Sequence, residues 1–270
     1  LFQEALKFGK EKEFLSRIEE GKLLFSDAFP YMGKCFYIPK PVIHIEPKAD
    51  QEQGNSRKKK LFKNLKYIPQ ENLEIFFKGD FEEKHMGSLK ELGSYAMKTA
   101  VAVRGKPEPY RVSTFCFKDG NGLYLILAYK GKEDKEFFEE LLESLSYTGI
   151  GGKRSAGFGR FEAVERKMPE SLRKKLTDTG KMNILLSTAL PQKQQLEKVL
   201  EEATYTLIRR GGFIDSQNLK DGPKRKKDIY VFAPGSCFKT TFSGQVEEEE
   251  TGGEHSVFRY EKALFLGVNL

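Results

Sequence analysis

One run of the chain, in which five glycines alternate with cations, restricts the fold more than any other segment. Residues 149–161 read Gly-Ile-Gly-Gly-Lys-Arg-Ser-Ala-Gly-Phe-Gly-Arg-Phe. Glycine adopts positive φ without steric cost and leaves backbone N–H groups open to a bulky anion, while Lys153, Arg154 and Arg160 add positive charge. We therefore interpret the run as a loop that grips phosphates. The alternative is a flexible surface turn or a hairpin tip, which glycine-rich segments often form.

The sequence predicts an amphipathic helix before the glycine run and a strand after it. Apolar residues with helical spacing precede the run, and residues 161–165 alternate as in a strand. The apolar positions are Phe137, Phe138, Leu141, Leu142 and Leu145. Nucleotide-binding loops use the opposite order, because there a strand leads into the glycines and the glycines open a helix. The Gly-x₄-Gly-Lys-Ser/Thr spacing is also missing from the run, so a mononucleotide site is not expected.

The composition favours a polyanionic partner. The 270 residues suffice for two domains, and 46 Lys and Arg against 39 Asp and Glu give a net charge of +7. Cys35, Cys116 and Cys237 lie far apart, so neither a zinc cluster nor a disulfide framework is predicted, and a reducing cytoplasm is the expected location. We expect no membrane span and no signal peptide. Helical spacing already starts at Leu1 without a capping residue, which predicts further residues upstream.

Hydrophobic periodicity predicts the remaining elements. Two adjacent strands are expected over 112–118 and 123–129, joined as a hairpin by Asp-Gly-Asn-Gly at 119–122. Residues 82–110 contain few apolar anchors and predict a projecting arm. Helices are further predicted over 1–20, 134–147 and 196–203, and strands over 23–30, 182–190, 205–208, 228–233 and 256–268.

The order of these elements resembles the βαββαβ arrangement of ferredoxin-like folds, with a first strand missing from the chain. We therefore expect an α+β protein with two ferredoxin-like domains, the first over residues 1–165 and the second over 166–270. Three charged stretches are expected to be solvated, the last two of them in loops, although the second could extend a phosphate track. They are Arg57–Lys60 with Lys63 and Lys66, Lys224–Lys227, and Glu247–Glu250.

Several segments together resemble the RAMP proteins of CRISPR defence, and among them the family of fourth subunits of the type III-A Csm complex. The segments are Leu24-Phe25-Ser26-Asp27-Ala28-Phe29-Pro30, the glycine run 149–160, Arg210-Gly-Gly-Phe213, Gly235-Ser236 before Phe238, and His255-x-Val-Phe-Arg-Tyr260. The resemblance covers nearly the whole chain. Its most specific parts are the glycine run and the Ser-Asp-Ala-Phe-Pro segment.

The resemblance implies two RRM-like domains, a thumb hairpin at about 82–110 and a non-catalytic role. Such a cap subunit grips the 5′ repeat-derived tag of the guide RNA and joins a large polymerase-like, palm-domain subunit to the repeating backbone RAMP subunits in antiviral defence. Contact with target RNA would be indirect, and no cofactor or metal is implied. The implied RNA-binding residues are Gly151, Gly152, Lys153, Arg154, Ser155, Gly157, Phe158, Arg160, Arg104, Lys106 and Tyr110.

Among these residues, Lys153 and Arg154 would contact phosphates, and Phe158 would either stack on a base or anchor the loop in the core. A related alternative is a metal-independent endoribonuclease that processes guide RNA. Such an enzyme needs a histidine near a second polar group, and His44, His85 and His255 stand in no paired motif. A structural adaptor that does not contact RNA is the third possibility.

Overall fold

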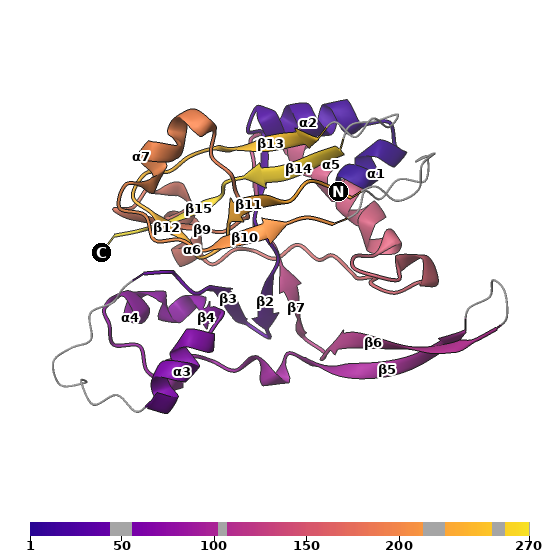
Figure 1. The fold of residues 1–270 in the computed structure, drawn as a ribbon, viewed down its shortest axis with the longest axis horizontal. Helices are drawn as coiled ribbons and strands as arrows, with labels where there is room; N and C mark the ends of the chain where they lie inside the picture. Colours follow the sequence, from indigo (N-terminus) through magenta and orange to yellow (C-terminus); the bar gives the residue numbers. More distant parts are fainter. Residues whose placement is uncertain (44–55, 102–106, 213–224, 250–256, 270) are drawn as a thin grey trace. The chain divides into compact units, whose positions relative to one another are not determined.

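The protein is a mixed α+β structure in which all described strand pairs are antiparallel (Figure 1). The computed structural model describes residues 1–43, 56–101, 107–212, 225–249 and 257–269. It divides into two compact units, unit 1 with residues 1–27 and 126–269 and unit 2 with residues 28–125. The α+β class predicted from the sequence is confirmed. The predicted domain boundary at residue 165 is a different division and stays a prediction.

Unit 1 begins with two short helices instead of the single helix predicted over residues 1–20. They are α1, Phe2–Lys7, and α2, Glu11–Glu19. Gly9 adopts a φ of +66°, which helical residues cannot have, so the chain turns there. Phe14 and Ile18 are buried, Leu15 is half-buried, and Leu6 is exposed.

The long helix predicted before the glycine run is confirmed as α5, Lys132–Thr148. Phe137, Phe138 and Leu141 form its buried face, and Asp134 accepts the Gly131 N–H at 2.9 Å and so satisfies a donor at the start of the helix. The neighbouring strands of unit 1, β1 (Leu23–Phe25) and β8 (Leu127–Tyr129), pair with each other.

The C-terminal part of unit 1 is built from short strands and two helices. Its elements are α6 (Glu170–Thr177), β9 (Met182–Leu185), α7 (Leu196–Leu200), β10 (Leu207–Arg210), β11 (Ile229–Phe232), β12 (Cys237–Phe238), β13 (Gly244–Glu249), β14 (Val257–Lys262) and β15 (Phe265–Val268). They form a three-stranded sheet in the order β12-β9-β15 and the pairs β10-β11 and β13-β14. The predicted strand 256–268 is broken at Ala263–Leu264, since β14 pairs with β13 whereas β15 pairs with β9.

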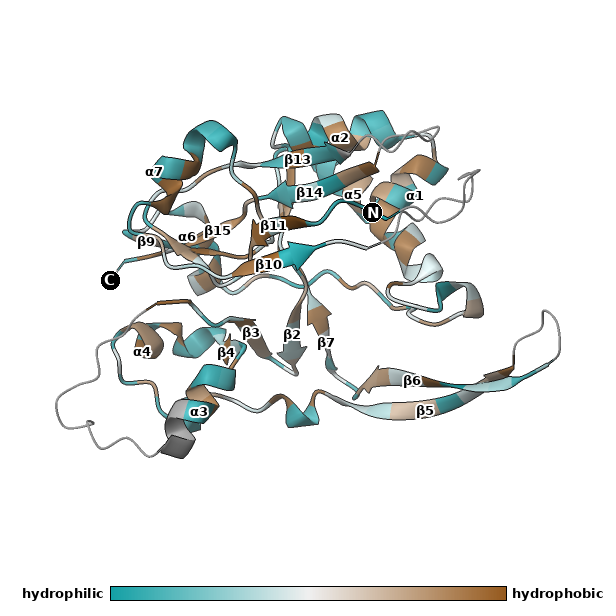
Figure 2. Cartoon of the chain, in the orientation of Figure 1, coloured by the Kyte–Doolittle hydropathy of each residue, from teal (hydrophilic) through white to brown (hydrophobic). Residues whose placement is uncertain are grey.

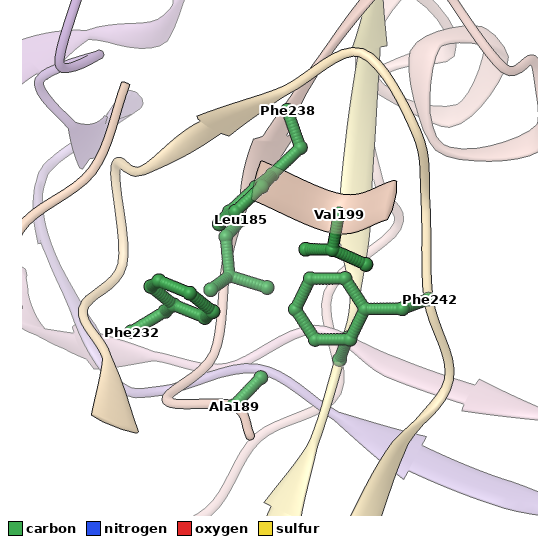
Figure 3. Close-up of a cluster of buried hydrophobic side chains, with 7 residues drawn as sticks. Leu185, Ala189, Val199, Phe232, Phe238 and Phe242 are labelled. Atoms are coloured by element: carbon green, nitrogen blue, oxygen red, sulfur yellow. The ribbon is translucent and has the colours of Figure 1, made fainter. Parts of the chain in front are cut away.

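A cluster of aromatic and aliphatic side chains forms the core beneath this sheet (Figure 3). Phe232, Phe238 and Phe242 contact one another with ring centroids 5.0 to 6.2 Å apart. Leu185, Ala189, Val199 and Ala263 complete the buried set. Burial of such side chains stabilises a fold by about 1.5–3 kcal/mol each, so this cluster gives the C-terminal part a core of its own.

Unit 2 contains a four-stranded sheet in the order β4-β3-β2-β7 and a long hairpin. The sheet strands are β2 (Phe29–Met32), β3 (Cys35–Pro39), β4 (Tyr67–Pro69) and β7 (Asn121–Tyr124), and the helices are α3 (Ser56–Asn64) and α4 (Leu73–Phe77). The hairpin consists of β5 (Gly93–Val101) and β6 (Pro109–Phe117).

The hairpin predicted between residues 112–118 and 123–129 is wrong. The turn itself forms, because Gly120 has a φ of +78° and the Asn121 N–H donates to the Lys118 carbonyl at 3.0 Å. However, β6 pairs with β5, and the chain beyond the turn divides into β7 and β8, which pair with β2 and β1. Of the arm predicted over 82–110, residues 83–85 and 89–91 form short 3₁₀ turns, and the hairpin itself runs from β5 to the end of β6, over 93–117.

Two further predictions are corrected. Residues 161–165 form no strand, although their side chains alternate in polarity. Glu247–Glu249 belong to β13 and not to a loop, because they pair with residues 257–259 of β14. The basic cluster 57–60 lies in α3, and Arg225–Lys227 lie just before β11. Lys224 and Glu250 lie outside the described residues.

Candidate nucleic-acid interface

The glycine-rich loop starts where α5 ends and is closed by backbone hydrogen bonds. Gly149 caps the helix with a φ of +83°, and its N–H donates to the Leu145 carbonyl at 2.7 Å. The Ile150 N–H then donates to the Gly159 carbonyl at 2.9 Å, and the Phe161 N–H donates to the Ser146 carbonyl at 3.3 Å. The two ends of the loop are thereby held together, so residues 151–158 form a defined lobe.

The five glycines of the loop fall into two groups. A side chain on Gly149 or Gly159 would collide with backbone, since a Cβ on Gly159 would lie 1.9 Å from the Ile150 carbonyl oxygen. By contrast, a Cβ on Gly151, Gly152 or Gly157 would meet no atom within 4 Å. Gly149 and Gly159 are therefore required to close the loop, whereas the other three present bare backbone to the outside.

The cations of the loop differ in their surroundings. Lys153 adopts a left-handed conformation with a φ of +62° and is exposed, as are Ser155 and Arg160. Arg154 is half-buried and donates to the Gln3 side-chain oxygen of α1 at 3.1 Å. Arg154 thus ties the loop to α1, in addition to the phosphate contact that the sequence predicts.

Phe158 is half-buried at the base of the lobe. Its N–H donates to the Lys153 carbonyl at 3.3 Å, and the Ala156 N–H donates to the same carbonyl at 3.0 Å. The backbone of Phe158 therefore helps to fold the lobe. Its partial exposure leaves both predicted roles, stacking and anchoring, as predictions.

A buried carboxylate supports the end of α5 that carries the loop. Glu4 of α1 is fully buried and accepts hydrogen bonds from Lys7 at 2.9 Å, Ser144 at 2.6 Å and Thr148 at 3.2 Å. Burial raises the pKa of Glu4, but these hydrogen bonds and the nearby ammonium group outweigh burial, and the pKa lies below its ordinary value. An ionised Glu4 therefore fixes α1 against the last turn of α5.

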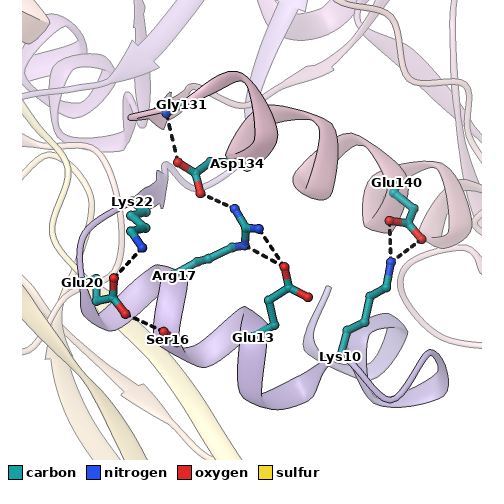
Figure 4. A network of polar contacts seen from close by, with 9 residues as sticks. All are labelled: Lys10, Glu13, Ser16, Arg17, Glu20, Lys22, Gly131, Asp134 and Glu140. Atoms are coloured by element: carbon teal, nitrogen blue, oxygen red, sulfur yellow. Dashed lines mark hydrogen bonds and ion pairs between the residues drawn. The ribbon is translucent and has the colours of Figure 1, made fainter.

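Ion pairs also join α2 to α5 (Figure 4). Arg17 bridges Glu13 on its own helix and Asp134 on α5, and Lys10 pairs with Glu140 at 2.7 Å. The Arg17 guanidinium lies 4.8 Å from the centre of the Phe137 ring. Because several charges act together, this network orients α5 better than isolated surface pairs would.

Unit 2 provides the predicted arm, but only part of its predicted site is described. Arg104 and Lys106 lie outside the described residues, and Tyr110 is half-buried on β6 opposite Ala100. The loop belongs to unit 1 and the arm to unit 2.

The hairpin carries an exposed apolar strip that the sequence analysis missed. Tyr95 and Met97 of β5 are 79% and 64% exposed, and Tyr95 contacts Phe115 of β6 with ring centroids 5.2 Å apart. Phe115 in turn contacts Phe117 at the same centroid distance. The strip could have been found from the two-residue spacing of Tyr95 and Met97 and of Phe115 and Phe117, which puts these side chains on one face of a strand.

The described residues offer little for acid–base or metal chemistry. His85 Nδ1 accepts the Glu82 N–H at 3.0 Å and so closes a turn, while His44 and His255 lie outside the described residues. Within the described ranges, no group of three or more His, Cys, Asp or Glu side chains could hold a metal ion. Nor does any helix in these ranges have the length and apolarity needed to cross a lipid bilayer.

Known protein families match both the N-terminal and the C-terminal part of the chain. The RAMP superfamily model matches residues 4–162, and the model of the CRISPR Csm4 C-terminal domain matches residues 178–268. The protein named CRISPR system Cms protein Csm4 of Mycobacterium tuberculosis (strain CDC 1551 / Oshkosh) is 34% identical over 269 residues, which are 98% of this chain and 86% of the relative. The protein of the same name from Streptococcus thermophilus is 33% identical over 282 residues, which cover 100% of this chain and 88% of the relative.

Solved structures share the fold. A Csm3–Csm4 subcomplex of the type III-A CRISPR-Cas interference complex contains a chain with a TM-score of 0.65 and 20% identity, covering 100% of this chain and 91% of that one. A Csm1–Csm4 cassette bound to AMPPNP contains a chain with a TM-score of 0.62 and 19% identity, covering 100% of this chain and 88% of that one.

Proposed function

The chain belongs to the Csm4 family of the RAMP superfamily, and we propose that it is the non-catalytic guide-RNA-binding subunit of a type III-A CRISPR effector complex. The observation that carries this proposal is the closed glycine loop, in which Gly151, Gly152 and Gly157 leave backbone open beside the exposed Lys153. The 5′ tag of the guide RNA would lie against this lobe.

The chemistry of the lobe suits a phosphodiester backbone. Bare backbone N–H groups can approach phosphate oxygens closely where no Cβ intervenes, and the cations lower the electrostatic cost of the approach. Lys153, Arg154, Ser155 and Arg160 would contact phosphates, and Phe158 would contact a base. Arg104, Lys106 and Tyr110 of the arm are proposed to touch the guide further along.

The partners follow from the family. Because relatives are known in a subcomplex with Csm3 and in a cassette with Csm1, we propose that this subunit joins the large polymerase-like subunit to the backbone subunits. Contact with target RNA would be indirect, and the complex would act in the cytoplasm. Two ferredoxin-like domains that meet near residue 165 are part of the proposal, supported by two family models that match on either side of that position.

Salt-dependent binding of guide RNA tests the role of the loop. Lys153→Gly removes the cation and suits the positive φ at this position, so the backbone is not strained. If Lys153 contacts one phosphate, the slope of log K against log salt should fall by about 0.7 in magnitude for a single strand. Lys153→Arg keeps the charge and serves as the control. An unchanged slope in the glycine variant would exclude the phosphate contact.

Cleavage assays test the alternative enzyme. Incubation with unprocessed repeat RNA should give no site-specific product. A product that disappears in His44→Ala or His255→Ala would instead identify a guide-processing endoribonuclease. If guide RNA crosslinks nowhere in residues 149–160, the subunit would be an adaptor without RNA contact at this loop.

A further inference from the structure

The β10-β11 pair turns a mixed aromatic and cationic face to solvent. Register places Arg209 opposite Tyr230, and Leu207, two residues before Arg209, lies on the same face. Tyr230 is 61% exposed and Leu207 is 48% exposed, while Phe232, which pairs with Leu207, is buried in the aromatic core and Val231, on the opposite face, is fully buried. Tyr205 is also exposed and contacts Phe232 with ring centroids 5.0 Å apart. We call Tyr205, Leu207, Arg209, Arg225 and Tyr230 the β10-β11 surface.

Cations gather where β10 ends and β11 begins. Arg209 and Arg225 approach the same carboxylate, Asp228, at 3.8 and 3.5 Å, and both guanidinium side chains remain more than half exposed. One carboxylate between two cations leaves net positive charge at the surface. The end of β10 is strongly hydrophilic in Figure 2, next to the apolar start of the same strand.

A buried arginine fixes this end of the pair. The side chain of Arg259 on β14 donates to the Arg210 carbonyl at 3.0 Å and also to the Lys227 carbonyl. Arg259 is only 7% exposed, so its guanidinium holds the two chain segments together from below. The cations of the β10-β11 surface therefore project from a braced backbone.

The glycine loop and the β10-β11 surface are connected through α1 and β14. Arg154 of the loop donates to Gln3, and the adjacent Phe2 packs edge-on against Phe258 with ring centroids 5.2 Å apart. Phe258 directly precedes Arg259, which holds the end of β10. Both surfaces thus belong to one continuous set of contacts within unit 1.

We propose that the β10-β11 surface is a second binding site for single-stranded RNA, in which Arg209 and Arg225 contact phosphates and Tyr230 stacks on an unpaired base. This inference rests on the proposed function, because the bound strand would be the guide RNA held by the glycine loop. Positive charge fits a polyanion, and exposed tyrosines beside arginines are typical of surfaces on which unpaired bases stack. Continuity with the loop favours RNA over an acidic protein surface.

Binding of the mature guide RNA to the full-length chain, measured by fluorescence anisotropy at several salt concentrations, tests the second site. Arg209→Ala with Arg225→Ala should reduce the magnitude of the salt slope by about 1.4, the value for two single-strand phosphate contacts. Lys174→Ala with Lys198→Ala removes the same charge from α6 and α7, where both side chains are exposed, and should leave the slope unchanged. Tyr230→Leu should weaken binding by about 5- to 140-fold without changing the slope.

The outcomes distinguish failure of the second site from failure of the proposed function. If the wild-type chain binds no guide RNA, the proposed function fails. If Lys153→Gly lowers the slope but the arginine and Tyr230 variants bind like wild type, only the second site fails. Variants that bind RNA normally but no longer co-purify with the large subunit would assign the surface to a protein partner. If the double arginine variant does not fold, Tyr230→Leu and crosslinking of thiouridine-containing guide to the tryptic peptide 228–239 still test the second site. Normal binding by Tyr230→Leu, together with absence of that crosslink, would overturn the second site.

Discussion

At the scale of single residues, Gly159 and Gly152 of the loop predict different effects of the same substitution. Gly159→Ala would force a Cβ against the Ile150 carbonyl oxygen at a φ of +77°, so it should destabilise the protein by about 1–3 kcal/mol. Gly152→Ala meets no atom within 4 Å and lies at a conformation open to L residues, so the melting temperature should stay unchanged.

The variants Gly159→Ala and Gly152→Ala also distinguish a phosphate-binding lobe from a simple turn. If RNA approaches the bare backbone, Gly152→Ala should weaken guide binding although the fold is intact. Thermal melting and a binding titration of both variants check this. Normal binding by Gly152→Ala would mean that the glycine is not needed for contact with RNA.

Glu261 predicts a pH dependence of stability. Its carboxylate is fully buried. Arg210 at 3.9 Å, the Thr188 hydroxyl and Arg259 favour ionisation, whereas the nearby Asp27 opposes it. Burial dominates and raises the pKa of Glu261 to about 7.

Proton linkage gives the direction in which stability changes with pH. Between the ordinary pKa of 4.5 and about 7, the folded state binds more protons at Glu261 than the unfolded state does, so the free energy of unfolding falls as pH rises through this window. Glu261→Gln should remove this loss and make the protein more stable than wild type at pH 8, by on the order of 3 kcal/mol. Glu248→Gln on the exposed part of β13 is the control. Denaturant titrations at pH 5 and pH 8 measure the difference, and equal pH dependence of Glu261→Gln and wild type would contradict it.

At the scale of elements, the sequence predicts structure that depends on neighbouring residues, but it does not predict which distant strands pair. Helix α5 and its glycine cap follow from apolar spacing and from Gly149, all within one stretch of chain. The turn at Gly120 was also recognised, but its flanking strands pair with β5, β2 and β1, which no local pattern reveals. The role of Arg154 in binding Gln3 could not be read either, because the two residues are 151 positions apart.

The exposed strip on the β5-β6 hairpin predicts an effect on assembly without an effect on folding. Tyr95→Ser with Phe115→Ser removes a ring contact that lies at the surface, so the melting temperature of the isolated subunit should change little. Exposed apolar patches mark interaction sites, so co-purification with guide RNA and the backbone subunit should decrease. Val112→Ser with Cys116→Ser changes the opposite face and should leave assembly intact. A collapsed fold in the first variant would instead assign the strip to the core.

At the scale of the whole molecule, unit 2 is a single insertion into unit 1. The chain leaves unit 1 after Asp27 and returns at Ile126, where the Ser26 N–H donates to the Ile126 carbonyl and the Ile126 N–H donates to Ser26 Oγ, both at 2.9 Å. The two ends of the insertion therefore lie side by side in an antiparallel arrangement. A short glycine-containing turn could connect them without moving either strand.

Excision of residues 28–125 tests whether RNA binding and assembly reside in different units. Unit 1 keeps its aromatic core, α5 with the glycine loop, and the β10-β11 surface, so the shortened chain should unfold in one cooperative transition and still bind a short RNA that carries the tag. It lacks the hairpin with its apolar strip, so it should fail to co-purify with the backbone subunit. Calorimetry and pull-down experiments measure these properties. Loss of cooperative unfolding would show that unit 1 needs the insertion to fold, whereas normal assembly would show that the hairpin is dispensable for joining the complex.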